Sequence, residues 1–196
     1  GPVTLSLNRS TFDCSDLGHL QVRLTVTDAS GNVSEALADI TITDNTPPVI
    51  QATDLTLALD ENGRASVSKE SLVTGISDNC GIWSVSVSQN EFSCEHIGKN
   101  PVTITVEDVR GNRSTATVTI TVVDNTPPVV RARDITLYLD QSGKASLTSA
   151  QVDEGSKDNC GITRLSIDRE QFDCNTLGEQ PITLTATDAA GNTSAV

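Results

Sequence analysis

The chain has 196 residues, a net charge of −13 at pH 7 and a pI near 4.3, and only 3% of its residues are aromatic. This acidity argues against nucleic acid and against anionic membrane surfaces as partners. No apolar stretch is long enough to cross a bilayer, so we expect no membrane contact by this segment. The many Val, Thr and Ser residues favour β-strands over helices.

An 80-residue period organises the chain. Three motifs recur at this spacing: DNTPPV at 44–49 and 124–129, [SK]DNCGI at 77–82 and 157–162, and TDASGN, EDVRGN and TDAAGN at 27–32, 107–112 and 187–192. Such regularity is typical of a tandem array. We therefore expect the C-terminal part of one repeat at 1–44, a complete repeat at 45–124, and a third repeat without its final strand at 125–196.

In the complete repeat, alternating apolar residues predict strands separated by turns. In chain order, the expected elements are strands at 54–60 and 64–68, a short helical turn within 69–80, and strands at 82–89, 101–109 and 114–124. The RGNR sequence between the last two strands is a hairpin signal. Short strands with turns about every 8–12 residues predict an all-β, immunoglobulin-like β-sandwich.

The linkers contain paired prolines, Pro47–Pro48 and Pro127–Pro128. Proline cannot donate to a strand ladder, and it restricts the residue before it, so each pair should stiffen an extended connector. Short, stiff connectors between sandwiches predict an elongated rod of repeats.

The five cysteines follow the period. Two fall in each of the later repeats, which predicts the disulfides Cys80–Cys94 and Cys160–Cys174 and leaves Cys14 without a partner. Each would contribute roughly 3 kcal/mol in the chain-entropy model. A zinc site is the weaker alternative, because the two histidines occupy different columns of the repeat. Disulfides place the protein outside the cytosol.

Aspartates from three segments should meet at one end of each sandwich, where the incoming linker, the B–C loop and the F–G loop lie together. The expected groups are Asp44, Asn45, Asp78 and Asp108 at one joint, and Asp124, Asn125, Asp158 and Asp188 at the next. Oxygen ligands of this kind suit Ca²⁺. The alternative is that these carboxylates cap backbone N–H groups of turns. The two roles are compatible. Asp60 and Asp140, in the A–B turn at the opposite end, are weaker candidates for the following joint.

The linker VVDNTPPVV, the TDAAGNTS hairpin and the ITLYLD run resemble the HYR-like immunoglobulin-type repeats of large bacterial surface adhesins, including gliding and attachment proteins of Bacteroidota. The linker is also similar to the calcium-rigidified joints of cadherins. The first resemblance implies secreted or cell-surface bacterial repeats without enzyme activity. They would form a stalk that projects an adhesive or motility-linked tip, and would contact chiefly their neighbours in the chain.

Two other functions remain open. The repeats could themselves bind a surface glycan or a protein partner, or they could form an accessory array in a secreted polysaccharide-degrading enzyme. Trp83 and Tyr138 share no repeat column, which weakens the glycan alternative. For the third repeat, which lacks its final strand, two outcomes are open: it frays, or residues 35–43 of another molecule complete it in a strand-exchanged dimer.

Overall fold

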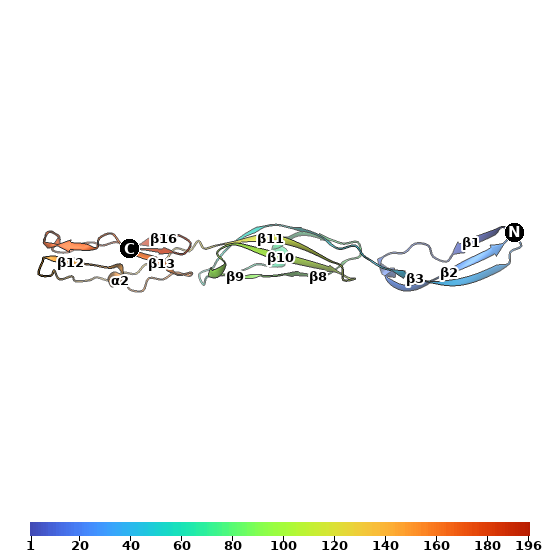
Figure 1. Cartoon of the computed structure of the whole chain (residues 1–196), viewed down its shortest axis with the longest axis horizontal. Coiled ribbons are helices and arrows are strands. Elements are labelled where there is room, and N and C mark those ends of the chain that lie inside the picture. Colours follow the sequence, from blue (N-terminus) through green and yellow to red (C-terminus); the bar gives the residue numbers. More distant parts are fainter. The chain divides into compact units, whose positions relative to one another are not determined.

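The structure is a computed structural model that describes every residue from Gly1 to Val196. Figure 1 shows the strands and short helices along the chain. The chain divides into two compact units. The first contains Gly1–Ala52, Val73–Val87 and Thr103–Ala116, and the second contains Thr53–Leu72, Ser88–Val102 and Thr117–Val196. Each unit thus combines residues of two successive 80-residue periods. The boundaries at 44 and 124 stay a prediction from the periodicity.

The first unit begins with an antiparallel sheet of order β1-β2-β3. A short 3-10 helix lies between β1 and β2. These elements are β1 (Val3–Leu7), η1 (Cys14–Asp16), β2 (Gly18–Asp28) and β3 (Val33–Ile42). Strand β3 pairs with β2 from Val33 to Ile42. The segment predicted to be exchanged between molecules is therefore already held, almost throughout, in its own sheet.

Residues 49–123 form three further sheets, of orders β5-β11-β10-β8, β4-β7 and β6-β9. The elements are β4 (Val49–Ala52), β5 (Leu55–Ala58), β6 (Arg64–Ser66), α1 (Lys69–Leu72), β7 (Val73–Ser77), β8 (Ile82–Val87), β9 (Glu91–Ser93), η2 (Cys94–His96), β10 (Gly98–Asp108) and β11 (Arg113–Val123). Strand β5 runs parallel to β11, and the other pairings given by register are antiparallel. This is the predicted all-β, immunoglobulin-like sandwich, with the predicted helical turn at α1.

The third repeat is less regular. Its elements are β12 (Lys144–Ser146), α2 (Ser149–Val152), β13 (Ile162–Ile167), β14 (Gln171–Asp173), η3 (Cys174–Thr176), β15 (Leu184–Asp188) and β16 (Thr193–Ala195). The ITLYLD run at 135–140 forms no strand, whereas its equivalent β5 does. The reason is pairing: β5 bonds to Ile120–Val123 of β11, and the positions equivalent to those residues lie beyond Val196.

The core follows the strand alternation. In β10, Val102, Ile104 and Val106 are fully buried, while the residues between them are half-buried. In the third repeat Leu147, Val152, Phe172 and Leu184 form the buried cluster. Leu5 and Leu7 of β1 are exposed. Residues 1–44 form only the β1-β2-β3 sheet, so no second sheet packs on that face.

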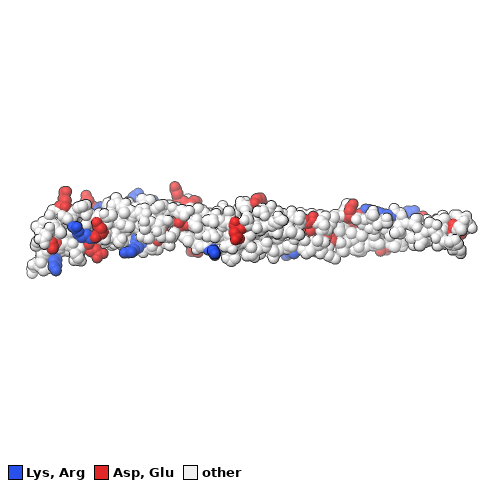
Figure 2. Space-filling view, turned by 90° about the horizontal axis from the view of Figure 1, so that it is seen from above, with Lys and Arg blue, Asp and Glu red and all other residues white.

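Charge is dispersed on the face seen in Figure 2. Asp and Glu stand there in small separate groups, with Lys and Arg among them. The net charge of −13 is therefore not gathered into one acidic surface on that face. No helix is long and apolar enough to cross a membrane.

Candidate metal centres

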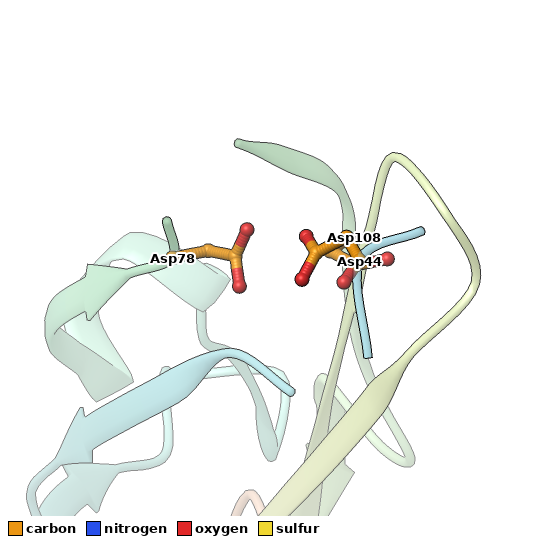
Figure 3. Close-up of side chains that lie close together, drawn as sticks. All are labelled: Asp44, Asp78 and Asp108. Carbon is orange, nitrogen blue, oxygen red and sulfur yellow. The ribbon is translucent and has the colours of Figure 1, made fainter. Parts of the chain in front are cut away.

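Two groups of three aspartates form where successive repeats meet, one in each unit. The first joint consists of Asp44, Asp78 and Asp108, and the second of Asp124, Asp158 and Asp188. In each group, one carboxylate oxygen from each of the three aspartates lies within 4.8 Å of the other two. Figure 3 shows Asp78 facing Asp44 and Asp108, which approach from the other side. The structure thus brings together the predicted acids from three separate segments.

Strand alternation explains why two acids of the first joint point inward. Asp108 follows Val106 by two positions at the end of β10, so it continues the buried face of that strand and is 1% exposed. Asp44 lies two positions beyond Ile42, the last residue of β3, and is 7% exposed. Burial of a charged group is unfavourable unless it is hydrogen-bonded or paired with a counter-charge.

Asp108 is held by its own hairpin turn. Its Oδ1 accepts hydrogen bonds from the backbone N–H groups of Arg110 (2.7 Å) and Asn112 (2.9 Å), and its Oδ2 accepts from Asn112 Nδ2 (2.6 Å). Burial, the largest single effect, tends to raise the pKa of this carboxyl. The hydrogen bonds from Asn112 and from the backbone of the turn together outweigh burial and lower the pKa. Asp108 is therefore a carboxylate at neutral pH.

Asp78 opens the DNC turn of the same joint. Its Oδ1 accepts from the backbone N–H groups of Cys80 and Gly81, both at 2.9 Å. Its other oxygen, Oδ2, is buried and has no hydrogen-bond partner. The capping alternative is thus confirmed for one oxygen. The second oxygen has no donor, and Figure 3 shows the Asp78 carboxylate facing the other two acids.

Asp44, in the linker, shows the same division. Its Oδ1 accepts from the backbone N–H of Thr46 (3.0 Å) and from Asn79 Nδ2 (3.1 Å), while its buried Oδ2 has no partner. Asn112 Nδ2 also donates to the backbone carbonyl of Asp44 (3.0 Å). Two asparagines therefore tie the linker to the DNC turn and to the hairpin turn. Both asparagines lie in the segments expected at this joint, but their hydrogen bonds to the linker were not predicted.

The second joint repeats this geometry. Asp124 Oδ1 accepts from Thr126 N (3.0 Å) and Asn159 Nδ2 (3.2 Å), and Asn192 Nδ2 donates to the Asp124 carbonyl (3.1 Å). Asp158 caps Cys160 N (2.8 Å), and Asp188 accepts from the backbone and side chain of Asn192. The buried oxygens without a partner are Asp124 Oδ2, Asp158 Oδ1 and Asn159 Oδ1.

Each joint offers part of the oxygen shell of a hard divalent cation, since Ca²⁺ takes about six to eight oxygens and the acid group supplies three carboxylates. One oxygen from each of the three carboxylates lies within 4.8 Å of the others. Two unit charges 4 Å apart repel by about 4 kcal/mol at an effective dielectric constant near 20. A bound cation would offset this repulsion, and the unpartnered oxygens would coordinate it as ligands. Oxygen ligands from flexible carboxylates are the preference of Ca²⁺. The residues therefore fit the predicted Ca²⁺.

The remaining predicted positions lie outside the acid groups. Asn45 and Asn125 are exposed, so their role as ligands stays a prediction. Asp60 reaches the second joint through its backbone carbonyl, which accepts from Asn159 Nδ2 at 3.0 Å. Its carboxylate instead caps Asn62 N and Arg64 N in its own turn. In both linkers the first proline is exposed and the second is buried.

The predicted disulfide pairing is wrong. The structure bonds Cys14 to Cys80 and Cys94 to Cys160, each over a sequence separation of 66 residues. The free thiol is the exposed Cys174, not Cys14. Each bond therefore joins the 3-10 helix of one repeat to the DNC turn of the next, where the prediction placed both bonds within repeats.

Strand β10 explains the error. Cys80 lies beside the C-terminal end of β10, because the carbonyl of its neighbour Gly81 accepts a hydrogen bond from Val109 N (3.2 Å). Cys94 lies just before the start of β10 at Gly98. An 11-residue strand spans about 33 Å, whereas a disulfide needs Cα atoms less than about 7 Å apart. Cys80 and Cys94 cannot bond without unfolding the repeat.

The fold and the joints define a tandem array of immunoglobulin-like repeats cross-linked from one repeat to the next. No family model matches the chain. It is 31% identical to hyalin of Strongylocentrotus purpuratus over 177 residues, and 30% identical to hyalin of Lytechinus variegatus over 200 residues. These matches cover 86% and 97% of this chain, but only 15% and 37% of the two relatives. They support an HYR-like repeat and give no support to an origin in Bacteroidota.

Among solved structures, the chain is similar to the extracellular cadherin domains 1–4 of protocadherin gamma B7. The TM-score is 0.39 at 14% identity, over 100% of this chain and 65% of that one. The mouse cadherin-23 EC22–24 structure gives a TM-score of 0.37 at 13% identity, over 98% of this chain and 84% of that one.

Proposed function

We propose that these repeats are a structural spacer in an extracellular, adhesion-related protein, without enzyme activity of their own. In this function, each joint is fastened twice. A disulfide connects consecutive repeats, and Ca²⁺ bound by the three aspartates connects the linker to two loops of the following repeat. The result is an elongated stalk with restricted bending, whose partners are chiefly its own neighbouring repeats.

The observation behind this proposal is that both disulfides cross a joint at the same separation of 66 residues. A bond within a sandwich would stabilise that sandwich alone, whereas a bond across a joint also limits how far two sandwiches can separate under tension. Closing a loop of this size contributes about 4 kcal/mol in the chain-entropy model. Disulfides of this kind persist outside the cytosol, and the similarity to hyalin is consistent with an adhesive extracellular parent.

Small-angle scattering tests the proposal on the Cys174→Ala variant, in which no free thiol can cross-link molecules. Four conditions are compared: Ca²⁺ or chelator, each with and without a dithiol reductant. We expect the longest and narrowest distribution of interatomic distances with Ca²⁺ and intact disulfides, and a broader one after both are removed. Identical curves in all four conditions would exclude a mechanical role for the joints.

The other functions have less support. Trp83 and Tyr138 are 75% and 86% exposed, but they occupy non-equivalent positions in different repeats and so offer no repeated aromatic platform for glycans. Two further alternatives are an accessory array in a polysaccharide-degrading enzyme and attachment to a motility-linked tip. No residue of this chain supports either of them specifically.

Strand exchange also stays a proposal. It would have to replace the pairing of β3 with β2, which extends over Val33–Ile42. Light scattering of the Cys174→Ala variant over a hundredfold range of concentration tests it. A concentration-dependent dimer supports exchange, and a monomer throughout excludes it.

A further inference from the structure

The DNC turn performs two tasks at each joint. At the first joint, residues Asp78–Gly81 supply one acid of the group, the amide of Asn79 that orients Asp44, and the cysteine bonded to Cys14. The backbone N–H of the disulfide-bonded Cys80 itself donates to Asp78 Oδ1. A displacement of Cys80 would therefore either break this hydrogen bond or shift the Asp78 carboxylate.

The contacts of the disulfide sulfur atoms show how closely each disulfide packs against the DNC turn. Cys14 Sγ lies 3.2 Å from the carbonyl oxygen of Asn79, and Cys94 Sγ lies 3.5 Å from that of Asn159. At Gly63, in the A–B turn, an added Cβ would lie 2.5 Å from Cys94 Sγ and 2.9 Å from Asn159 O. At the second joint the turn thus sits against both the 3-10 helix and the A–B turn of the preceding repeat.

We propose that the inter-repeat disulfide sets the affinity of the joint for Ca²⁺, so that reduction of the disulfide weakens Ca²⁺ binding at that joint alone. This inference rests on the Ca²⁺ site of the proposed function. A dithiol reductant would supply the two electrons and two protons. The Cys14–Cys80 bond breaks, two thiols form, and the reductant becomes a disulfide.

Electrostatics supplies the coupling. Without a cation, three carboxylates repel one another, and movement of the DNC turn away from the linker relieves that repulsion. The disulfide removes such open conformations. When only a fraction of molecules has a closed turn, the apparent dissociation constant rises in inverse proportion to that fraction. By linkage, bound Ca²⁺ must protect the disulfide against reduction by the same factor.

The test is a Ca²⁺ titration followed by NMR at the amides of Gly81 and Gly161, one in each DNC turn. The reference is Cys174→Ala, and the test variant adds Cys14→Ala and Cys80→Ala. We expect the Gly81 midpoint to rise about tenfold, while the Gly161 midpoint stays unchanged. The matched variant with Cys94→Ala and Cys160→Ala should give the opposite pattern. The second site and the amide spectrum report whether the variant folds.

The outcomes separate the two proposals. Absence of any Ca²⁺-dependent shift in the reference protein would overturn the Ca²⁺ site and, with it, this inference. Normal binding in the reference with unchanged midpoints in the variants would overturn only the coupling. Equal weakening of both sites in each variant would also overturn it, because the effect would then not be local to a joint.

Discussion

Asn112 donates a hydrogen bond from its side-chain amide to the backbone carbonyl of Asp44, 68 residues earlier, over 3.0 Å. The same amide nitrogen donates to Asp108 Oδ2 (2.6 Å). One side chain thus holds the hairpin turn and the linker together, and Asn192 does the same for Asp188 and Asp124. The final asparagine of the EDVRGN and TDAAGN motifs is therefore part of the joint as well as of the turn.

Asn112→Ala should destabilise the first joint, because it leaves buried acceptors on Asp44 and Asp108 without a donor. The expected loss is about 1–3 kcal/mol in urea unfolding. Asn32→Ala is the matched control. Asn32 occupies the same turn position in the first repeat and bonds only to Asp28, so its loss should be smaller. Equal losses for the two variants would show that the bond to the linker contributes nothing.

Gly63→Ala should disturb the second joint. Gly63 has φ of 69°, and this conformation alone is unfavourable for alanine by about 1–2 kcal/mol. The new Cβ would also meet a disulfide sulfur at 2.5 Å and the backbone oxygen of Asn159 at 2.9 Å, neither of which can move freely.

Gly31→Ala separates the two effects of that substitution. Gly31 has φ of 85° but nothing within 4 Å of an added Cβ. We expect Gly63→Ala to lower the unfolding temperature more than Gly31→Ala does. If the two variants melt alike, the close packing at Gly63 makes no difference to stability.

The sequence predicted most of the acid groups, and the reason is physical. Strand alternation fixes which face Asp108 occupies, and the shared pole of the linker and two loops brings Asp78 and Asp44 to it. The hydrogen bonds from Asn79 and Asn112 to Asp44 were not predicted, because a turn motif alone does not reveal which atom of a distant linker its side chain contacts.

The disulfides were mispredicted for a different reason. Cys80 was paired with Cys94 because both belong to the same repeat, but two residues of one repeat need not lie close together. The predicted strand at 82–89 lies between the two cysteines in the chain and carries them toward opposite ends of the sandwich. Cross-repeat pairing follows once that strand is taken into account, since the 3-10 helix of one repeat then lies at the end that meets the DNC turn of the next.

Asp140→Asn should lower stability only above the acid range. The Ser142 hydroxyl, followed by the backbone N–H groups of Lys144 and Ser142, lowers the pKa of Asp140 below its ordinary value of 3.8. A group whose pKa is lower in the folded state stabilises the fold above the unfolded pKa, and this contribution disappears as pH falls through the folded pKa.

Urea unfolding at neutral pH and well below pH 3.8 checks this expectation. Wild type should be more stable than Asp140→Asn at neutral pH, and the difference should vanish in acid. Asp134→Asn, at an exposed position, serves as the control and should have little effect at either pH. A difference between wild type and Asp140→Asn that persists in acid would mean that the charge of Asp140 is not the cause.

Non-reducing peptide mapping by mass spectrometry, with free thiols alkylated before digestion, tests the central claim that covalent bonds cross the joints. We expect peptides linked through Cys14–Cys80 and Cys94–Cys160, and alkylation at Cys174 alone. Linkage of Cys80 to Cys94 and of Cys160 to Cys174, with alkylation at Cys14, would contradict it.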